Sequence, residues 1–150
     1  MTTLVARVDG ASRGNPGPAA YAVVIETPEG RRVAEISAVI GAATNNVAEY
    51  RGLIRALEYA LSRHAAHLKV FSDSELLTRQ MKGIYKIKSP GLKPLHQQAL
   101  ALAVRLESFS IEHVRREFNR DADRLANQAL DKARSGGSSR DAFGEVKEQA

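Results

Sequence analysis

Acidic residues stand at four places in the chain where a strand is expected to end or a helix to begin. Asp9 and Asp73 each close a short apolar segment with the period of a strand. Glu49 falls in the first turn of an expected helix. Asp121 and Asp123 both fall in the first turn of a later helix, and local sequence does not choose between them.

Each of these acids also has a plain structural interpretation. Asp9 suits a strand-end residue that hydrogen-bonds the following turn. The segment from Asn46 to Glu49 matches a capping box with Asn46 as the cap, and local sequence alone favours that interpretation of Glu49. An acid in the first turn of a helix is stabilised by the helix dipole, which accounts for Asp121 or Asp123 equally well.

Taken together, the acids favour one cluster that binds cations. Two unit charges about 4 Å apart repel by roughly 4 kcal/mol at an effective dielectric of 20, so four clustered carboxylates need protons or cations. The chain has no cysteine, and ligation by oxygen alone suits Mg²⁺ or Mn²⁺ rather than zinc. Two such ions about 3.5–4 Å apart are the arrangement used for in-line phosphodiester displacement. We therefore expect two Mg²⁺ ions per site, with Mn²⁺ as a substitute.

The elements that must position these acids follow from the periodicity of apolar residues. Period-2 segments predict strands at 4–9, 21–26, 32–40, 68–73 and 109–114. Period-3.6 segments predict helices at about 46–61, 74–82 and 94–107, and a last helix that Asn119 caps. This order predicts an α/β fold: a five-stranded mixed sheet, three antiparallel strands and then two parallel ones, flanked by helices. If the first and fourth strands are parallel neighbours, Asp9 and Asp73 lie side by side.

Length and composition limit the remaining possibilities. At 150 residues the chain is expected to form one domain over 1–134, followed by a flexible tail over 135–150 that opens with a Gly/Ser-rich run. The lack of cysteine excludes disulfide frameworks, zinc ribbons and thiol nucleophiles. A net charge of +5 permits a polyanionic partner without requiring one. No apolar run approaches the ~20 residues of a membrane span and no signal-peptide core is seen, so a cytoplasmic protein without a membrane partner is expected.

Four segments, in order and over residues 3 to about 133, resemble the motifs of type 1 ribonuclease H. Residues 9–18 (DGASRGNPGP) resemble its opening D-G-[AS]-x-x-G-N-P-G, and residues 44–49 (TNNVAE) resemble T-N-N-x-x-E. Residues 72–74 (SDS) resemble [TS]-D-S, and residues 119–126 (NRDADRLA) resemble N-x-x-x-D-x-L-A.

This resemblance implies an endonuclease that hydrolyses the RNA strand of RNA/DNA hybrids by a two-metal-ion mechanism, leaving 5′-phosphate and 3′-hydroxyl ends. It carries over Asp9, Glu49, Asp73 and Asp123 as the catalytic, metal-binding acids, and so prefers Asp123 to Asp121. By analogy Asp9 bridges both ions, Asp123 serves the ion beside the attacking water, and Glu49 and Asp73 serve the other.

The resemblance also implies a ribonuclease H-like fold and a set of substrate contacts. The expected partner is an RNA/DNA hybrid bound by a monomer, and the RNA strand is recognised through its 2′-hydroxyls, which DNA lacks. The matching positions are Gly10, Ser12, Asn15, Asn45, Glu49 and Glu75 for the RNA strand, with Thr44 and Asn46 for a DNA-phosphate pocket. From the residues alone, Asn15 and Asn45 serve equally well as turn formers.

Two departures from the family pattern leave details open. The segment 82–93 is short and lacks tryptophan, and so resembles the subgroup without the basic helix–loop handle; its four lysines either contact phosphates or form a solvated face. The loop before the last helix lacks the family's histidine. His113 lies one step earlier, and Arg115 or Arg116 is the alternative group to approach the scissile phosphate.

Two other classes compete with a nuclease. One is a module that binds hybrids without cutting, and the other is a kinase-like or actin-like domain with the same kind of sheet. The second normally needs two such domains, for which 150 residues leave no room. A module that only binds has no physical reason to keep a costly cluster of carboxylates.

Overall fold

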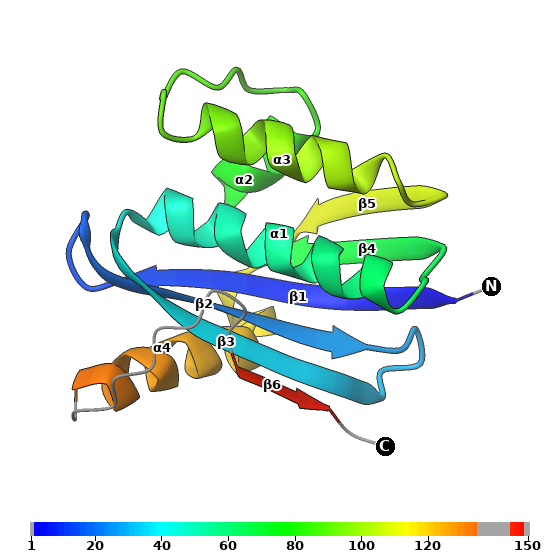
Figure 1. Ribbon diagram of the computed structural model, residues 1–150, viewed down its shortest axis with the longest axis horizontal. Helices are drawn as coiled ribbons and strands as arrows, with labels where there is room; N and C mark the ends of the chain where they lie inside the picture. The colour runs from blue at the N-terminus through cyan, green and yellow to red at the C-terminus, as the bar shows by residue number, and fades with distance from the viewer. Residues whose placement is uncertain (1, 135–144, 149–150) are drawn as a thin grey trace.

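β1 (Thr3–Ser12) lies in the middle of the sheet and joins its antiparallel half to its parallel half. In the computed structural model, which describes residues 2–134 and 145–148, six strands run in the order β5-β4-β1-β2-β3-β6 (Figure 1). The other strands are β2 (Gly17–Glu26), β3 (Arg32–Ala43), β4 (His67–Ser72), β5 (Ser108–His113) and β6 (Glu145–Glu148).

The strand directions confirm the mixed sheet predicted from the sequence. β1, β2 and β3 form an antiparallel meander. β4 pairs with β1 in parallel, and β5 pairs with β4 in parallel. In this register Val8 lies opposite Ser72, so the residues that follow them, Asp9 and Asp73, come out at the same edge of the sheet.

The sixth strand is an addition that the sequence did not predict. β6 pairs antiparallel with β3, with Ser37 opposite Glu145 and Ala34 opposite Glu148. The expectation of a flexible tail is therefore wrong for Glu145–Glu148, whose backbone forms part of the sheet. The rest of that predicted tail, 135–144 and 149–150, lies outside the described residues.

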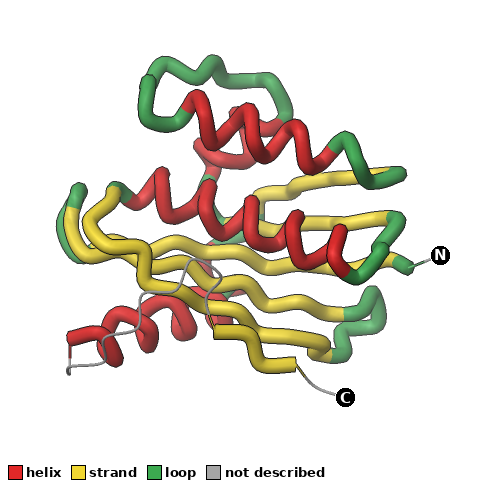
Figure 2. The backbone as a smooth tube through the Cα atoms, viewed as in Figure 1, coloured by secondary structure: helices red, strands yellow, loops and turns green. Residues whose placement is uncertain are grey.

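Helices cover both faces of the sheet (Figure 2). α1 (Asn45–Ser62) and α4 (Arg120–Arg134) both pack on β1, β2 and β3, and therefore do so from opposite faces. α2 (Glu75–Met81) and α3 (Lys93–Ala103) lie on the α1 side, and α3 ends four residues before the predicted end of its helix. No helix in the described part of the chain is both long and apolar enough to span a membrane.

The largest part of the core lies between α1 and the sheet. The stripe predicted for α1 is buried there, including Tyr50, Leu53 and Leu57, against Val8 and Val23 of the sheet. Burying apolar side chains of this size is the main source of the fold's stability. The core fixes α1 on β1, and so places the first turns of α1 beside the end of β1.

Candidate active site

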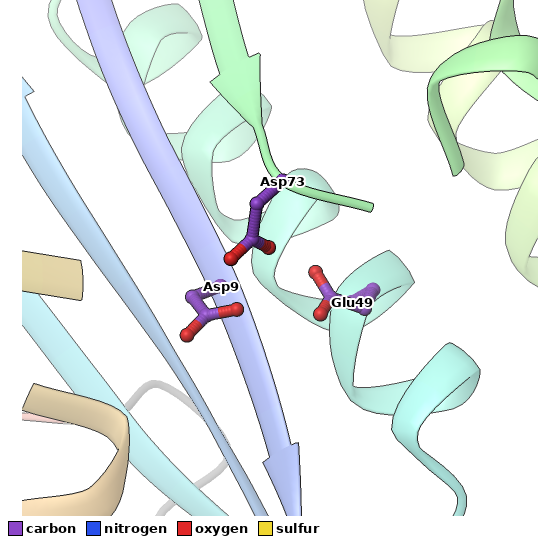
Figure 3. Close-up of side chains that lie close together, drawn as sticks. All are labelled: Asp9, Glu49 and Asp73. Carbon is purple, nitrogen blue, oxygen red and sulfur yellow. The ribbon is translucent and has the colours of Figure 1, made fainter. Parts of the chain in front are cut away.

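Three carboxylates from three separate elements point toward one another (Figure 3). Asp9 belongs to β1, Glu49 to α1, and Asp73 follows directly after β4. One carboxylate oxygen of each residue lies within 4.8 Å of those of the other two. Asp9 is only 4% exposed and Glu49 only 7%, so the group is largely withdrawn from water.

Gly10 is what allows Glu49 to reach this group. A Cβ atom at position 10 would lie 2.5 Å from the backbone nitrogen of Glu49 and 2.8 Å from the Cβ atom of Ala48. Only a glycine lets the first turns of α1 approach β1 so closely. The predicted role of Gly10 as an RNA contact is a separate matter, which its burial beneath α1 does not support directly.

The capping-box interpretation of Glu49 is wrong. α1 begins at Asn45, and its cap is Thr44, whose Oγ1 accepts a hydrogen bond from the Val47 N–H at 3.3 Å. Asn46 is therefore inside the helix, and Glu49 is its fifth residue, too far along to bond back to the cap. The side chain of Glu49 instead lies with Asp9 and Asp73.

The structure separates Asp123 from Asp121. Asp123 lies beside the three clustered acids, since its charge and a side-chain hydrogen bond are among the causes that raise the pKa of Asp9. Asp121 points elsewhere: its Oδ2 is 2.5 Å from Nη2 of Arg32, and its Oδ1 is 3.5 Å from Nη2 of Arg124. Asp121 thus ties α4 to β3, while Asp123 is the acid of α4 at the cluster.

Burial and mutual repulsion raise the pKa values of the clustered acids. Burial is the largest cause for Asp9, followed by the charges of Glu49, Asp73 and Asp123, and its pKa reaches about 10. The pKa of Glu49 is raised to about 8, first by burial and then by Asp73, against the opposing Gly10 N–H and Arg116. Burial also raises the pKa of Asp73, against the charge of Arg116. Such a cluster holds protons at neutral pH unless a cation replaces them.

The donor set fits a divalent cation. Oδ2 of Asp9 and Oε2 of Glu49 are fully buried, and neither finds a hydrogen-bond partner among the described residues. Buried polar atoms are normally paired, so two unpaired carboxylate oxygens facing a third carboxylate call for a positive ligand. Carboxylate oxygens without sulfur or imidazole suit Mg²⁺ or Mn²⁺.

Asn119 anchors the start of α4 beside Asp9, a contact that the sequence did not predict. It is 1% exposed, and its Nδ2 donates a hydrogen bond to the Val8 carbonyl at 2.8 Å. Its own carbonyl accepts from the Asp123 N–H at 3.1 Å, as expected of the residue before a helix. The polar residue in front of the helix was visible in the sequence, but its contact with a strand 111 positions away was not.

Arg116 is the basic group that the fold brings to the acids. It opens the short 3₁₀ turn η1 (Arg116–Phe118), and its Nε lies 3.9 Å from Oδ2 of Asp73. Its side chain is 83% exposed and so remains accessible to a ligand. His113, the other alternative for the missing loop histidine, is an exposed residue at the end of β5.

The expected substrate-contacting residues gather where the β1–β2 turn meets the loop before α1. Oδ1 of Asn15 accepts the Asn45 N–H at 3.0 Å, and the Ser12 hydroxyl donates to the Ala43 carbonyl at 2.8 Å and is also close to the Gly14 carbonyl. These bonds hold the turn near the N-terminal end of α1. Their contacts with a substrate stay a prediction.

Three further expected contacts occupy the helix starts. Thr44 uses its hydroxyl as the α1 cap, and Asn46 is exposed in the first turn of that helix. Glu75 is exposed at the start of α2 and pairs with Arg79 at 3.5 Å. Asn46 and Glu75 therefore remain open to solvent near the acids.

Comparisons with known proteins agree with this geometry. A family model described as reverse transcriptase-like matches residues 7–129. RNase H1 from Halobacterium salinarum is 43% identical, with a TM-score of 0.84 over 87% of this chain and 98% of that one. The chain belongs to the type 1 ribonuclease H family.

Two more members of the type 1 ribonuclease H family are close relatives. The N-terminal RNase H domain of a Mycobacterium tuberculosis protein is 46% identical, with a TM-score of 0.86 over 90% of this chain and 98% of that domain. The complete mycobacterial protein is called bifunctional, and this chain spans 36% of its length. LC11-RNase H1, solved in complex with an RNA/DNA hybrid, is 43% identical with a TM-score of 0.82 over 87% of this chain and 98% of that one.

Proposed function

We propose that this chain hydrolyses the RNA strand of RNA/DNA hybrids. The observation that carries the proposal is the group of three carboxylates within 4.8 Å, two of whose oxygens are buried and unpaired, in a member of the ribonuclease H family. A relative 43% identical to this chain has been solved with such a hybrid, which supports the choice of substrate.

Asp9, Glu49, Asp73 and Asp123 are the residues that would hold two Mg²⁺ ions, or Mn²⁺ in their place. When bound, such ions activate an attacking water and stabilise the leaving oxygen of a phosphodiester. The proposed products are a 5′-phosphate and a 3′-hydroxyl. The chain's own contribution is to fix these carboxylates in a largely buried position, where their charges act with little screening by water.

Residues around the cluster supply binding and orientation. Arg116, exposed and 3.9 Å from Asp73, is placed to contact a phosphate oxygen of the strand being cut. The turn of Ser12 and Asn15, joined to Asn45, presents polar groups suited to 2′-hydroxyls, which both donate and accept. These contacts would distinguish an RNA strand from DNA at the same place.

A basic segment supports binding of the hybrid's backbone. Residues 76–106 contain six basic residues and no acidic one. Of its lysines, Lys82 pairs with Glu112 at 2.7 Å, while Lys86, Lys88 and Lys93 are exposed. Each lysine that contacts a phosphate should add about 0.9 to the magnitude of the slope of log K against log salt concentration.

The proposal is tested with matched RNA/DNA, RNA/RNA and DNA/DNA duplexes, with Mg²⁺ and with a chelator. We expect cleavage only of the RNA strand of the hybrid and only with the metal. The Asp9→Asn variant serves as the control for a contaminating nuclease. Wild-type protein that binds the hybrid and leaves it intact in Mg²⁺ would favour a binding module, the alternative to a nuclease. Action as a cytoplasmic monomer stays part of the proposal.

A further inference from the structure

One face of the sheet next to the active site has no helix over it. α4 packs on β1, β2 and β3, and among the described elements no helix packs on β4 and β5 from that side (Figure 1). Along β4, Leu68, Val70 and Ser72 are buried beneath the α1 side, so Lys69 and Phe71 point to the uncovered side. Lys69 lies opposite Ser110 of β5 and Phe71 lies opposite Glu112.

The aromatic and cationic side chains of this face lie in contact with one another. The Arg7 guanidinium lies 5.0 Å from the centre of the Phe71 ring, and Nζ of Lys69 lies 5.8 Å from it. Nη1 of Arg7 also donates to the Phe118 carbonyl at 3.3 Å. Phe118 is 63% exposed, although burying a ring of this size would be favourable. We call Arg7, Lys69, Phe71 and Phe118 the open face.

The charge of the open face favours a polyanion. Its two acidic neighbours are already paired, Glu26 with Arg7 at 3.3 Å and Glu112 with Lys82 at 2.7 Å. Lys69 adds an exposed positive charge beside them. Cations interleaved with exposed aromatic rings are the combination that binds single-stranded nucleic acid, in which unpaired bases stack on rings and guanidinium planes.

The open face is continuous with the active site. Phe71 lies two residues before Asp73, and Phe118 lies two residues after Arg116, whose Nε is 3.9 Å from that same Asp73. At the rise of a strand, Lys69 lies about 13 Å back from Asp73. A strand whose phosphate lies at Asp73 can therefore run directly onto the open face.

From this we infer that the open face binds the unpaired extension of the RNA strand where that strand leaves the hybrid. The choice of the RNA strand depends on the proposed function, because Asp73 and Arg116 would contact the strand that is cut. The chain would then bind hybrids that end in single-stranded RNA more tightly than blunt ones, and would act preferentially near such junctions.

The test measures binding by fluorescence anisotropy, with the Asp9→Asn variant and a chelator so that nothing is cut. The ligands are a blunt hybrid and the same hybrid with an RNA extension of about six nucleotides at either end, within the ~4–16 nucleotide site sizes of single-strand grooves. We expect one of the extensions to tighten binding about tenfold, the effect of roughly one stacked base.

Phe118→Ala and Lys69→Ala, each added to Asp9→Asn, should remove most of that gain and leave affinity for the blunt hybrid within about twofold, since neither side chain is part of the acid cluster. Val104→Ala, at an exposed apolar residue just after α3, is the matched control and should keep the gain. The inference is overturned if RNA extensions give no gain, if DNA extensions give the same gain, or if Phe118→Ala weakens blunt and extended hybrids alike. Cleavage of the blunt hybrid by wild-type protein tests the proposed function separately, so the two ideas can fail independently.

Discussion

At the scale of single residues, Asp9 separates the needs of chemistry from those of folding. It is the most crowded acid of the cluster, with the charges of Glu49, Asp73 and Asp123 all acting on it. Asp9→Asn should lower cleavage by about a thousandfold or more, since it removes a charged ligand of the ions. The free energy of unfolding in a chelator should rise by about 1–3 kcal/mol, because a neutral amide relieves repulsion. Chemical denaturation measures this, and a variant that cuts normally, or melts well below wild type, would show that the cluster has been misread.

Asp121 and Asp123 form a matched pair two residues apart on α4. Asp123→Asn should reduce cleavage strongly with little loss of stability, because Asp123 acts on the acid cluster. Asp121→Asn should keep cleavage and lower the free energy of unfolding by about 0.5–1 kcal/mol, since it weakens a partly exposed ion pair with Arg32. Cleavage rates and denaturation curves for the two variants decide the matter, and the reverse pattern would return the catalytic role to Asp121.

At the scale of the elements, the start of α1 decides where Glu49 points. Thr44→Ala should lower the free energy of unfolding by about 1 kcal/mol, because it removes the helix cap. Asn46→Ala, the matched control, should change it by less than about 0.5 kcal/mol, as expected of an exposed helix residue. Thermal or chemical denaturation distinguishes the two, and a larger loss for Asn46→Ala would revive the capping box.

The elements also show why some parts of the structure could be predicted and others could not. The neighbouring positions of Asp9 and Asp73 follow from two parallel strands that end in acids, which periodicity alone reveals. The exact start of α1 does not, because Thr44 and Asn46 are both good caps and the path of the chain chooses between them.

Contacts between distant parts of the chain carried no local signal. Arg32 and Asp121 are 89 positions apart, and the sequence gave no sign that they would pair. β6 follows a Gly/Ser-rich run that resembles a linker, and its pairing with β3 depends on an edge that only the folded sheet provides. The choice of Asp123 over Asp121 came from the family resemblance and agrees with the contacts in the structure.

At the scale of the whole molecule, the cluster links stability to pH. The pKa of Asp9 rises from 3.8 to about 10 on folding and that of Glu49 from 4.5 to about 8, so between these values the folded chain holds more protons than the unfolded one. In a chelator, the contribution of the cluster to the free energy of unfolding is therefore greatest at low pH and falls as the pH rises through about 8 and then about 10. Denaturation at a series of pH values measures it, and Asp9→Asn should flatten the dependence.

Mg²⁺ should reverse this trend. The cation binds the ionised carboxylates of the folded chain, so its stabilising effect should grow with pH and with its concentration. A free energy of unfolding that rises between pH 6 and pH 9 in the chelator, or that does not respond to Mg²⁺ at pH 9, would contradict the assignment of these acids as a cation site.

The central claim is that Asp9, Glu49, Asp73 and Asp123 together bind divalent ions beside the strand to be cut. The most direct measurement is the anomalous difference density of Mn²⁺ in crystals of the protein with an RNA/DNA hybrid. We predict two peaks among these four carboxylates, next to one phosphate of the RNA strand. Density that shows no ion there, or ions bound only at other acids such as Asp121, would contradict the account.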